Sequence, residues 1–281
     1  MQKSLNRFTL AVLTGALCFA IMPHAQGALI QADFDHGGSD ASPNTTDIDA
    51  YPGTVGGGWT SAWNKPGSAG TKTAAVVNTS PFGSGGNYLT LNVSGNANQD
   101  GFVQRSYGSP VDLTERHIVS FDYRLQADAF STGQDIVQLW DVASGVSWYI
   151  IAYGDRNNWQ VYNGDRADGG FTFSRVLDTG MPFTPGTDYS FEIDVKPTTR
   201  SWDVTISDGT LSQTMTNLGF RTSAFSARGN LQFGGRISST GETHVHAIDS
   251  LQIVPEPGAL VLLATAFACM LIPGRRRRRV R

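Results

Sequence analysis

The sequence predicts an all-β protein, an antiparallel β-sandwich, with an apolar helix at each end of the chain. Three observations support this fold class. Short runs of alternating apolar and polar residues recur along the centre of the chain, as they do in half-buried strands. Pro and Gly separate these runs at short intervals. No central stretch repeats its apolar residues about every 3.6 positions, as an amphipathic helix would.

The first 27 residues have the pattern of a secretory signal peptide. Lys3 and Arg7 form a charged start, and residues 8–22 form the apolar stretch that follows. Ala25 and Gly27 place small residues at the two positions that a signal peptidase reads. We therefore expect residues 1–27 to direct export and then to be removed.

The central segment, residues 28–253, is long enough for one all-β domain. Of the 21 Lys and Arg of the chain, 13 lie in this segment, against 23 of the 24 Asp and Glu, so its net charge is −10. Such an acidic surface is a poor match for phosphate backbones, which argues against a nucleic-acid partner. Both cysteines, Cys18 and Cys269, lie outside it, which excludes a disulfide or a thiolate metal site there.

The strands can be placed in order along this segment. Residues 35–75 contain Gly and Pro pairs and are expected to form loops, with Trp59 and Trp63 packed beneath them. Polar turn residues then separate apolar runs, as in hairpins. The expected strands are 88–93, 101–107, 117–125, 135–142, 146–153, 158–162, 171–177, 189–195, 202–206, 231–237 and 244–253.

The clearest pattern is the stretch 189–206. Apolar residues alternate with polar ones on both sides of a turn at residues 196–200, which predicts a hairpin with one buried and one hydrated face. About eleven short strands without helices favour a sandwich or jelly roll.

The last 28 residues form three blocks. Val254, Pro255, Glu256 and Pro257 are followed by 15 uncharged residues, 258–272, and then by Arg275, Arg276, Arg277, Arg278 and Arg279. An apolar run before an arginine cluster is a membrane stop signal with the arginines on the cytoplasmic side. As a helix the run spans roughly 22 Å, short of a bilayer core of about 30 Å, and snorkelling arginines would cover the difference.

The order of these blocks resembles the PEP-CTERM sorting signal, which is found in bacteria that make extracellular polysaccharide. The resemblance is confined to residues 254–281 and implies a membrane exosortase as processing partner. The alternative is a plain C-terminal membrane anchor that is never cut. Either way the central domain is expected outside the cytoplasmic membrane, at the cell surface or beyond it after processing.

The central domain carries a second, more diffuse resemblance. The hairpin YSFEIDVKPTTRSWDVTISDG, with residues 32–35 and 247–251, resembles strands of concanavalin A-like and laminin-G-like jelly rolls. Domains of this kind often hold Ca²⁺ between their first and last strands, and carboxylates suit this hard cation. By this resemblance Asp33, Asp35 and Asp249 are candidate ligands of a structural Ca²⁺.

Catalytic motifs are weak. The glucanases that this fold resembles use Glu-x-Asp-x-x-Glu on one strand, and the nearest match, Glu192-Ile193-Asp194, has Pro197 at the third position. We therefore expect these two carboxylates on the hydrated face of the hairpin. His244 and His246 share one strand face, but without a visible third ligand we interpret them as surface histidines.

Sugar binding needs aromatic groups beside polar ones. Trp148 is expected in the core, whereas Trp140, Tyr149, Tyr153 and Tyr162 are the candidates for a carbohydrate platform. The sequence thus predicts an exported, non-catalytic surface or matrix protein associated with exopolysaccharide. A glycan-cleaving enzyme that uses aspartates is the rival, and a purely structural filler is a third reading.

Overall fold

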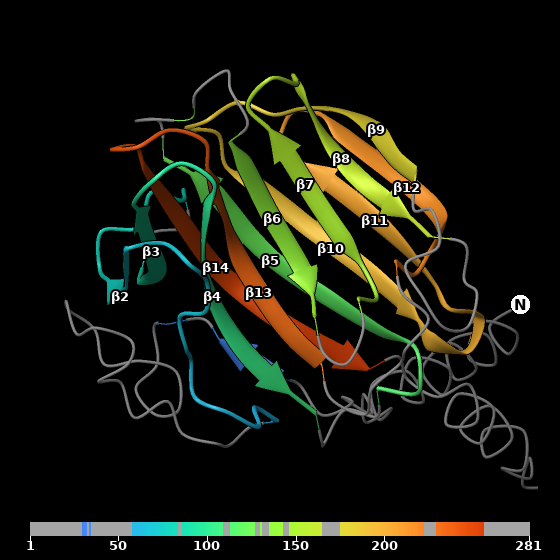
Figure 1. Ribbon diagram of the computed structural model, residues 1–281. Coiled ribbons are helices and arrows are strands. Elements are labelled where there is room, and N and C mark those ends of the chain that lie inside the picture. The colour runs from blue at the N-terminus through green and yellow to red at the C-terminus, as the bar shows by residue number, and fades with distance from the viewer. Residues whose placement is uncertain are drawn as a thin grey trace, which may run out of the picture. The chain divides into compact units, whose positions relative to one another are not determined.

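The fold is an all-β sandwich of two antiparallel sheets, as the sequence predicts. The computed structural model describes residues 30–32, 34, 58–83, 86–108, 113–126, 130, 135–142, 146–164, 175–221 and 229–255. They belong to one compact unit, Ala28–Pro255. In Figure 1 the smaller sheet lies in front of the larger one.

The larger sheet has eight strands in the order β12-β11-β10-β5-β14-β3-β2, with β1 paired to β14. Its strands are β1 (Ile30–Ala32), β2 (Thr71–Val77), β3 (Tyr88–Ser94), β5 (His117–Leu125), β10 (Tyr189–Lys196), β11 (Ser201–Ser207), β12 (Ser212–Gly219) and β14 (Thr243–Pro255).

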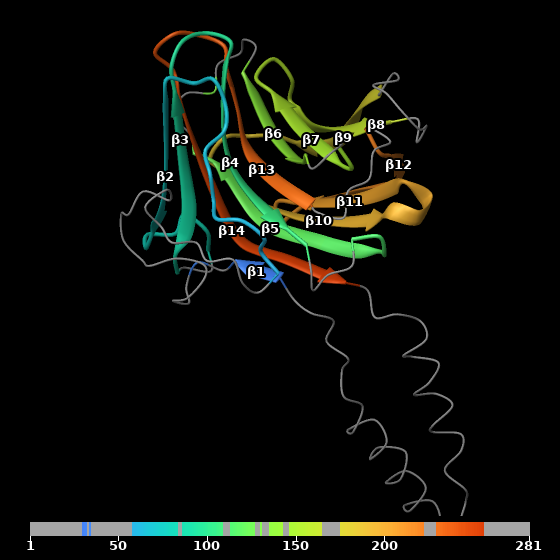
Figure 2. The same cartoon turned by 60° about the horizontal axis from the view of Figure 1, so that its bottom comes forward.

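The smaller sheet has six strands in the order β4-β13-β6-β7-β8-β9. They are β4 (Gln99–Tyr107), β6 (Ile136–Asp141), β7 (Tyr149–Tyr153), β8 (Asn158–Asn163), β9 (Arg175–Pro182) and β13 (Gly229–Ile237). Figure 2 shows β2 and β3 at one side of the sandwich and β8, β9 and β12 at the other.

The hairpin predicted at residues 189–206 is β10 and β11. Ser190 pairs with Ser207 and Lys196 with Ser201, and the short 3₁₀ turn Pro197–Thr199 (η1) joins the two strands. Arg200 closes the turn in the left-handed region, at φ 49°. Strand alternation buries Tyr189, Phe191, Ile193 and Val195 on β10 and leaves the residues between them exposed or half-buried. This register fixes which side chains of β10 face solvent.

The core lies between the sheets and is rich in aromatic rings. Trp159 on β8 meets Phe191 on β10 edge-on with ring centroids 5.1 Å apart, and Phe233 on β13 meets Phe121 on β5 at 4.9 Å. Each such pair contributes about 0.5–1.5 kcal/mol beyond the area that it buries. Trp148 is fully buried, and Trp59 and Trp63 join the same core cluster, as predicted.

The structure corrects several boundaries. The expected loop 35–75 ends too late, because β2 begins at Thr71, and the expected strand 171–177 lies instead at Arg175–Pro182. β12 was not predicted, since its face is mostly polar. β14 continues through Val254 and Pro255, which pair with Ile118 and His117 of β5. No helix in the described part of the chain is long and apolar enough to cross a membrane.

Candidate functional site: the outer face of the smaller sheet

Three of the four platform candidates form one row across the smaller sheet, on the outer face, which is turned away from the larger sheet. Trp140 on β6 pairs with Tyr149 on β7. Continuing the β7–β8 register by one residue from Ile150 and Val161 places Tyr149 opposite Tyr162 on β8. We call Trp140, Tyr149 and Tyr162 the aromatic row.

The rings of the aromatic row stack on one another. The ring centroids of Trp140 and Tyr149 are 4.7 Å apart, and those of Tyr149 and Tyr162 are 4.5 Å apart with planes 7° from parallel. These separations match the spacing of neighbouring strands, about 4.8 Å, so the rings stand upright on the sheet with their faces against each other. Tyr149 is sandwiched and only 5% exposed. The row therefore offers a ligand ring edges, hydroxyls and the outermost ring faces.

Tyr153 lies on the same face, four residues beyond Tyr149, and belongs to the same apolar cluster. Burial, followed by the neighbouring Tyr162, raises the pKa of Tyr153 to about 12. Burial likewise raises the pKa of Tyr149, and Tyr162 adds to this increase while Arg221 opposes it. At neutral pH both phenols are therefore protonated and can donate hydrogen bonds. The structure thus brings all four platform candidates together, and their binding role stays a prediction.

Guanidinium groups border this cluster. The Arg221 guanidinium carbon lies 4.6 Å from the ring centroid of Tyr149 and 4.4 Å from that of Tyr162. Arg221 follows β12 of the larger sheet, and its backbone N–H reaches the carbonyl of Ser147, at 3.4 Å. Arg156 lies 5.3 Å from the ring centroid of Tyr153. Cations next to aromatic faces add about 0.5–2 kcal/mol each. Arg221 therefore links the end of β12 to the row.

Buried amide side chains occupy the positions beside the row. Gln232 on β13 pairs directly with Trp140, and Gln160 and Ile151 form the next cross-strand pair on this face. The Oε1 atoms of Gln160 and Gln232 and the Nε1 atom of Trp140 are buried without a hydrogen-bond partner. Leaving such a group unpaired costs about 1–3 kcal/mol. These two acceptors and one donor have no partner within the described part of the chain, and each lies beneath the surface of this face.

Gly234 leaves room on this face for the side chain of Phe102, because a Cβ atom there would lie 2.9 Å from the Phe102 ring. It pairs with both Phe102 and Gln138, so a side chain there would lie between them. A Cβ atom at Gly234 would lie 2.1 Å from the carbonyl oxygen of Gly101, and the φ of 153° also disfavours other residues. Phe102 instead reaches toward Trp140, with ring centroids 6.1 Å apart.

The outer face of the larger sheet is polar. It holds a shallow depression of about 360 Å³, whose lining includes Asp122, Ser190, Glu192, Thr205 and Gln252. The side chains of Phe121 and Phe191 belong to the core, so their backbone lines this depression. The described lining of this depression includes no outward aromatic ring, whereas the smaller sheet carries the aromatic row, so we take the smaller sheet as the candidate sugar-binding face.

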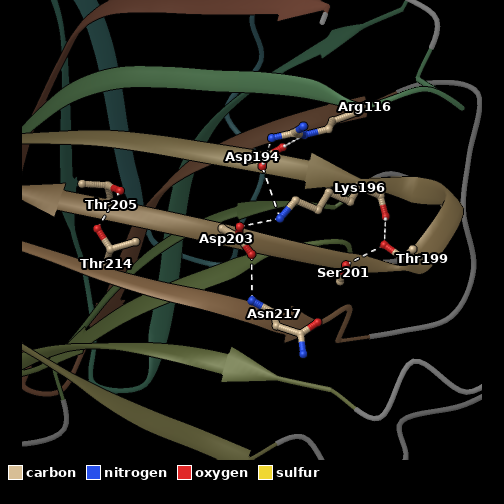
Figure 3. A network of polar contacts seen from close by, with 9 residues as sticks. All are labelled: Arg116, Asp194, Lys196, Thr199, Ser201, Asp203, Thr205, Thr214 and Asn217. Atoms are coloured by element: carbon tan, nitrogen blue, oxygen red, sulfur yellow. Dashed lines mark hydrogen bonds and ion pairs between the residues drawn. The ribbon is translucent and has the colours of Figure 1, made fainter. Parts of the chain in front are cut away.

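Glu192 and Asp194 lie on the hydrated face of the β10–β11 hairpin, as predicted. Glu192 is exposed, and Asp194 accepts two hydrogen bonds from Arg116, both 2.7 Å long. Lys196 bridges Asp194, at 3.3 Å, to Asp203. Figure 3 shows this network along β10, β11 and β12. Burial would raise the pKa of Asp194, but Arg116 and Lys196 outweigh it and lower that pKa.

The interpretation of His244 and His246 as surface histidines is wrong. They share a strand face, as predicted, but both side chains are buried. The reason is a β-bulge at Asp249–Gln252, with Ser250 at φ 53°, which reverses the alternation of β14. A 2.7 Å hydrogen bond joins the Tyr123 hydroxyl to Nδ1 of His246. Burial and the neighbouring His244 hold the pKa of His246 well below its usual value.

The candidate Ca²⁺ ligands are only partly described. Asp249 is buried, and its Oδ1 accepts the N–H of Ser250 at 2.7 Å. Asp33 and Asp35 lie outside the described residues. So do the cleavage residues Ala25 and Gly27, the motif residues Glu256 and Pro257, the apolar run 258–272 and the arginines 275–279. These assignments stay predictions.

Comparison with known proteins supports the fold. No family model and no curated protein matches the chain. An endo-β-1,4-glucuronan lyase of the fungus Trichoderma reesei is similar in structure, with a TM-score of 0.51 and 13% identity over 69% of this chain and 95% of that one.

Two further solved structures are more distant. Lectin II from Ulex europaeus has a TM-score of 0.43 and 12% identity, with 68% of this chain and 92% of the lectin covered. A carbohydrate esterase of a Shiga toxin-encoding bacteriophage has a TM-score of 0.42 and 16% identity, with 69% and 90% covered. At these identities the likeness to the lyase supports the β-sandwich fold and nothing finer.

The sequence did not indicate Arg221, Gln160 or Gln232 as parts of this site. They come from β8, β13 and the segment after β12, which are far apart in sequence and meet only through sheet pairing. The one available signal was strand alternation, which places Gln160 on the same face as Tyr162.

Proposed function

We propose that the chain is an exported protein that binds polysaccharide on the outer face of the smaller sheet. The observation that carries this proposal is the aromatic row, whose ring edges and phenol hydroxyls lie beside the amide side chains of Gln160 and Gln232. Sugar rings present both apolar C–H groups and hydroxyls, so a surface with ring edges and phenol hydroxyls complements them. The glucuronan lyase that shares this fold is named for action on a polysaccharide, in agreement with this ligand class.

The proposed role is non-catalytic. A tyrosine base needs a lowered pKa, whereas Tyr149 and Tyr153 have raised ones. The described carboxylates on this face include Asp100 on β4 and Asp178 on β9, the two edge strands. Five strand spacings, about 24 Å, separate them, whereas glycosidase carboxylates lie about 5–9.5 Å apart. Asp100 is also ion-paired with Arg236, at 2.9 Å.

Affinity electrophoresis of the full chain in gels that contain single polysaccharides tests the binding face. Trp140→Ala and Tyr162→Phe should each weaken the retardation, Trp140→Ala by about tenfold in Kd, which corresponds to about 1.4 kcal/mol. Thr205→Ala, on the outer face of the larger sheet, is the matched control and should bind as the wild type does. Unchanged binding in both row variants, or equal losses in Thr205→Ala, would contradict the assignment.

A second candidate function, glycan cleavage, rests on the depression in the larger sheet. Ser190 pairs with Asp122 and Glu192 with Ser120, so Asp122 and Glu192 are diagonal neighbours on β5 and β10. Diagonal residues lie about 7–8 Å apart, within the range of a glycosidase pair. Release of reducing ends that disappears in Asp122→Asn and Glu192→Gln would favour cleavage, and its absence in the wild type would exclude this activity on the glycans tested.

Export and exosortase processing form the other half of the proposal. Their support is the sequence pattern at residues 1–27 and 254–281. Mass spectrometry of the mature protein should find both ends removed. Recovery of the intact chain from the cytosol, with its arginine cluster, would overturn this half and leave the binding face untouched. Removal of residues 1–27 alone would favour a C-terminal membrane anchor that is never cut.

A further inference from the structure

Three side chains with metal-binding atoms meet at one end of the sandwich. Asp135 precedes β6, Glu242 lies in the turn between β13 and β14, and His244 lies near the start of β14. One ligand atom from each lies within 4.8 Å of the other two. Asp135 and His244 are buried, and Glu242 is half-buried. The cluster lies on neither outer face described above, and the proposed sugar binding does not use it.

His244 lacks the hydrogen bonds that a buried imidazole needs. A neutral ring has one donor and one acceptor nitrogen, and a charged ring has two donors. Only 1% of His244 is exposed, yet neither Nδ1 nor Nε2 has a hydrogen-bond partner. Buried polar groups are nearly always satisfied, so this ring requires an explanation. Phe130 packs against it, with ring centroids 5.6 Å apart, and offers no acceptor.

The distance from His244 to Asp135 suits two ligands of one ion. Nε2 of His244 lies 3.3 Å from Oδ2 of Asp135. A charge-assisted N–H···O bond is shorter, about 2.7–2.9 Å. Two ligands about 2.0–2.2 Å from a tetrahedral ion lie roughly 3.3–3.5 Å apart. The separation is therefore that of an edge of a coordination tetrahedron.

Backbone and hydroxyl groups already hold the two carboxylates in place. The N–H of Ser238 donates to Oδ1 of Asp135 at 2.6 Å, which leaves Oδ2 turned toward His244. The N–H of Ser239 donates to Oε2 of Glu242 at 3.0 Å. Outer hydrogen bonds of this kind orient metal ligands in known sites.

We propose that Asp135, Glu242 and His244 bind a divalent transition-metal ion, with zinc as the best fit. An imidazole nitrogen with two carboxylate oxygens suits zinc, whereas magnesium and calcium prefer oxygen ligands alone. Water would complete the coordination. Asp135 directly precedes β6 of the smaller sheet and His244 lies in β14 of the larger one, so the ion would link the two sheets in a domain that has no cysteine.

Zinc titration of the full chain, purified in mild detergent and stripped with EDTA, tests this site. Isothermal calorimetry should find one zinc per chain. At a zinc concentration about 100-fold above Kd, the melting temperature should rise by about 5–10 °C. Cobalt in place of zinc should give the intense visible absorption of a four-coordinate ion. A chain that binds no zinc in a saturable way would overturn the proposal.

Variants distinguish this site from incidental binding elsewhere on the chain. Glu242→Gln and Asp135→Asn should each weaken zinc binding at least tenfold. Glu192→Gln makes the same chemical change on an exposed strand and should leave the affinity unchanged. Because Asp135 is buried, its variant can fail to fold, so the half-buried Glu242 decides. Wild-type affinity in Glu242→Gln, or an equal loss in Glu192→Gln, would refute the assignment.

Discussion

The β10–β11 hairpin of the larger sheet and the aromatic row of the smaller sheet differ in how the polar groups on their outer faces are satisfied. On the larger sheet Asp194, Lys196 and Asp203 are paired with one another and with Arg116. On the smaller sheet the Oε1 atoms of Gln160 and Gln232 are buried and unpaired beside stacked rings.

The difference indicates what each face is built for. A network that satisfies its own charges stabilises the hairpin modestly and has little need of a ligand. Unpaired buried groups cost stability, and proteins retain such groups where a function requires them. We therefore expect the two faces to respond differently to the same kinds of change.

The largest effect is expected in the aromatic row. Tyr149→Ala removes a buried ring that is stacked on both sides, so it should lower the free energy of unfolding by about 3 kcal/mol. Thr205→Ala on the larger sheet should change it by less than about 0.5 kcal/mol. Urea denaturation measures both. Similar losses in the two variants would remove the contrast.

A smaller effect of opposite sign is expected at Gln160. Gln160→Leu replaces a buried, unpaired carbonyl oxygen with an apolar group, so it should raise the stability by about 1 kcal/mol and weaken polysaccharide binding. Gln252→Leu, the same substitution on the outer face of the larger sheet, should be neutral within about 0.5 kcal/mol. A destabilised Gln160→Leu protein would mean that the amide is satisfied after all.

Acid should affect the larger sheet. The pKa of Asp194 is lowered in the folded state. Its contribution to the free energy of unfolding is therefore complete above the pKa of the unfolded chain, near 4, and disappears as the pH falls through the pKa of the folded state. Asp194→Asn should lower stability by about 0.5–1 kcal/mol at pH 7 and less in high salt. The wild type and the variant should converge in denaturation curves measured toward pH 3. A constant difference at all pH values would exclude the charge as the cause.

High pH should affect the smaller sheet, and the ionisation of Tyr153 should be visible in the tyrosinate absorbance. Tyr153 has a pKa of about 12, above its ordinary value near 10, so the unfolded chain loses this proton first and stability decreases between these two pH values. Tyrosinate absorbance should contain a group with a midpoint near pH 12, and Tyr153→Phe should remove it. Its persistence in the variant would assign that midpoint to another tyrosine.

The sequence predicts the strands with strong alternation and misses those without it. β5 and the β10–β11 hairpin alternate clearly, and the structure confirms them. β2 contains small residues and β12 mainly polar ones, because both are edge strands with little core to cover. β9 extends through Gly180 and Pro182, which read as turn residues in sequence, since the edge of the smaller sheet tolerates both.

Of the candidate site, the sequence predicts only which face of its own strand each residue lies on. Alternation separates Tyr149 from Trp148, which lies in the core as expected. Sheet order, which no local pattern encodes, determines the contacts between strands. These contacts include the stacking of the aromatic row, the approach of Arg221 to it, and the meeting of Asp135 with His244. The bulge in β14 similarly hides the inward direction of the histidines.

The end of β14 constrains how the tail would be released. Val254 and Pro255 are paired with Ile118 and His117 of β5, inside the larger sheet. A processing enzyme needs an unpaired stretch of peptide in its active site. Scission between Val254 and Pro255 would therefore require the last rungs of the ladder to open first. A cut after Pro255 leaves the hydrogen-bonded domain intact. We therefore expect the processed domain to keep Val254 and Pro255 at or near its new C-terminus.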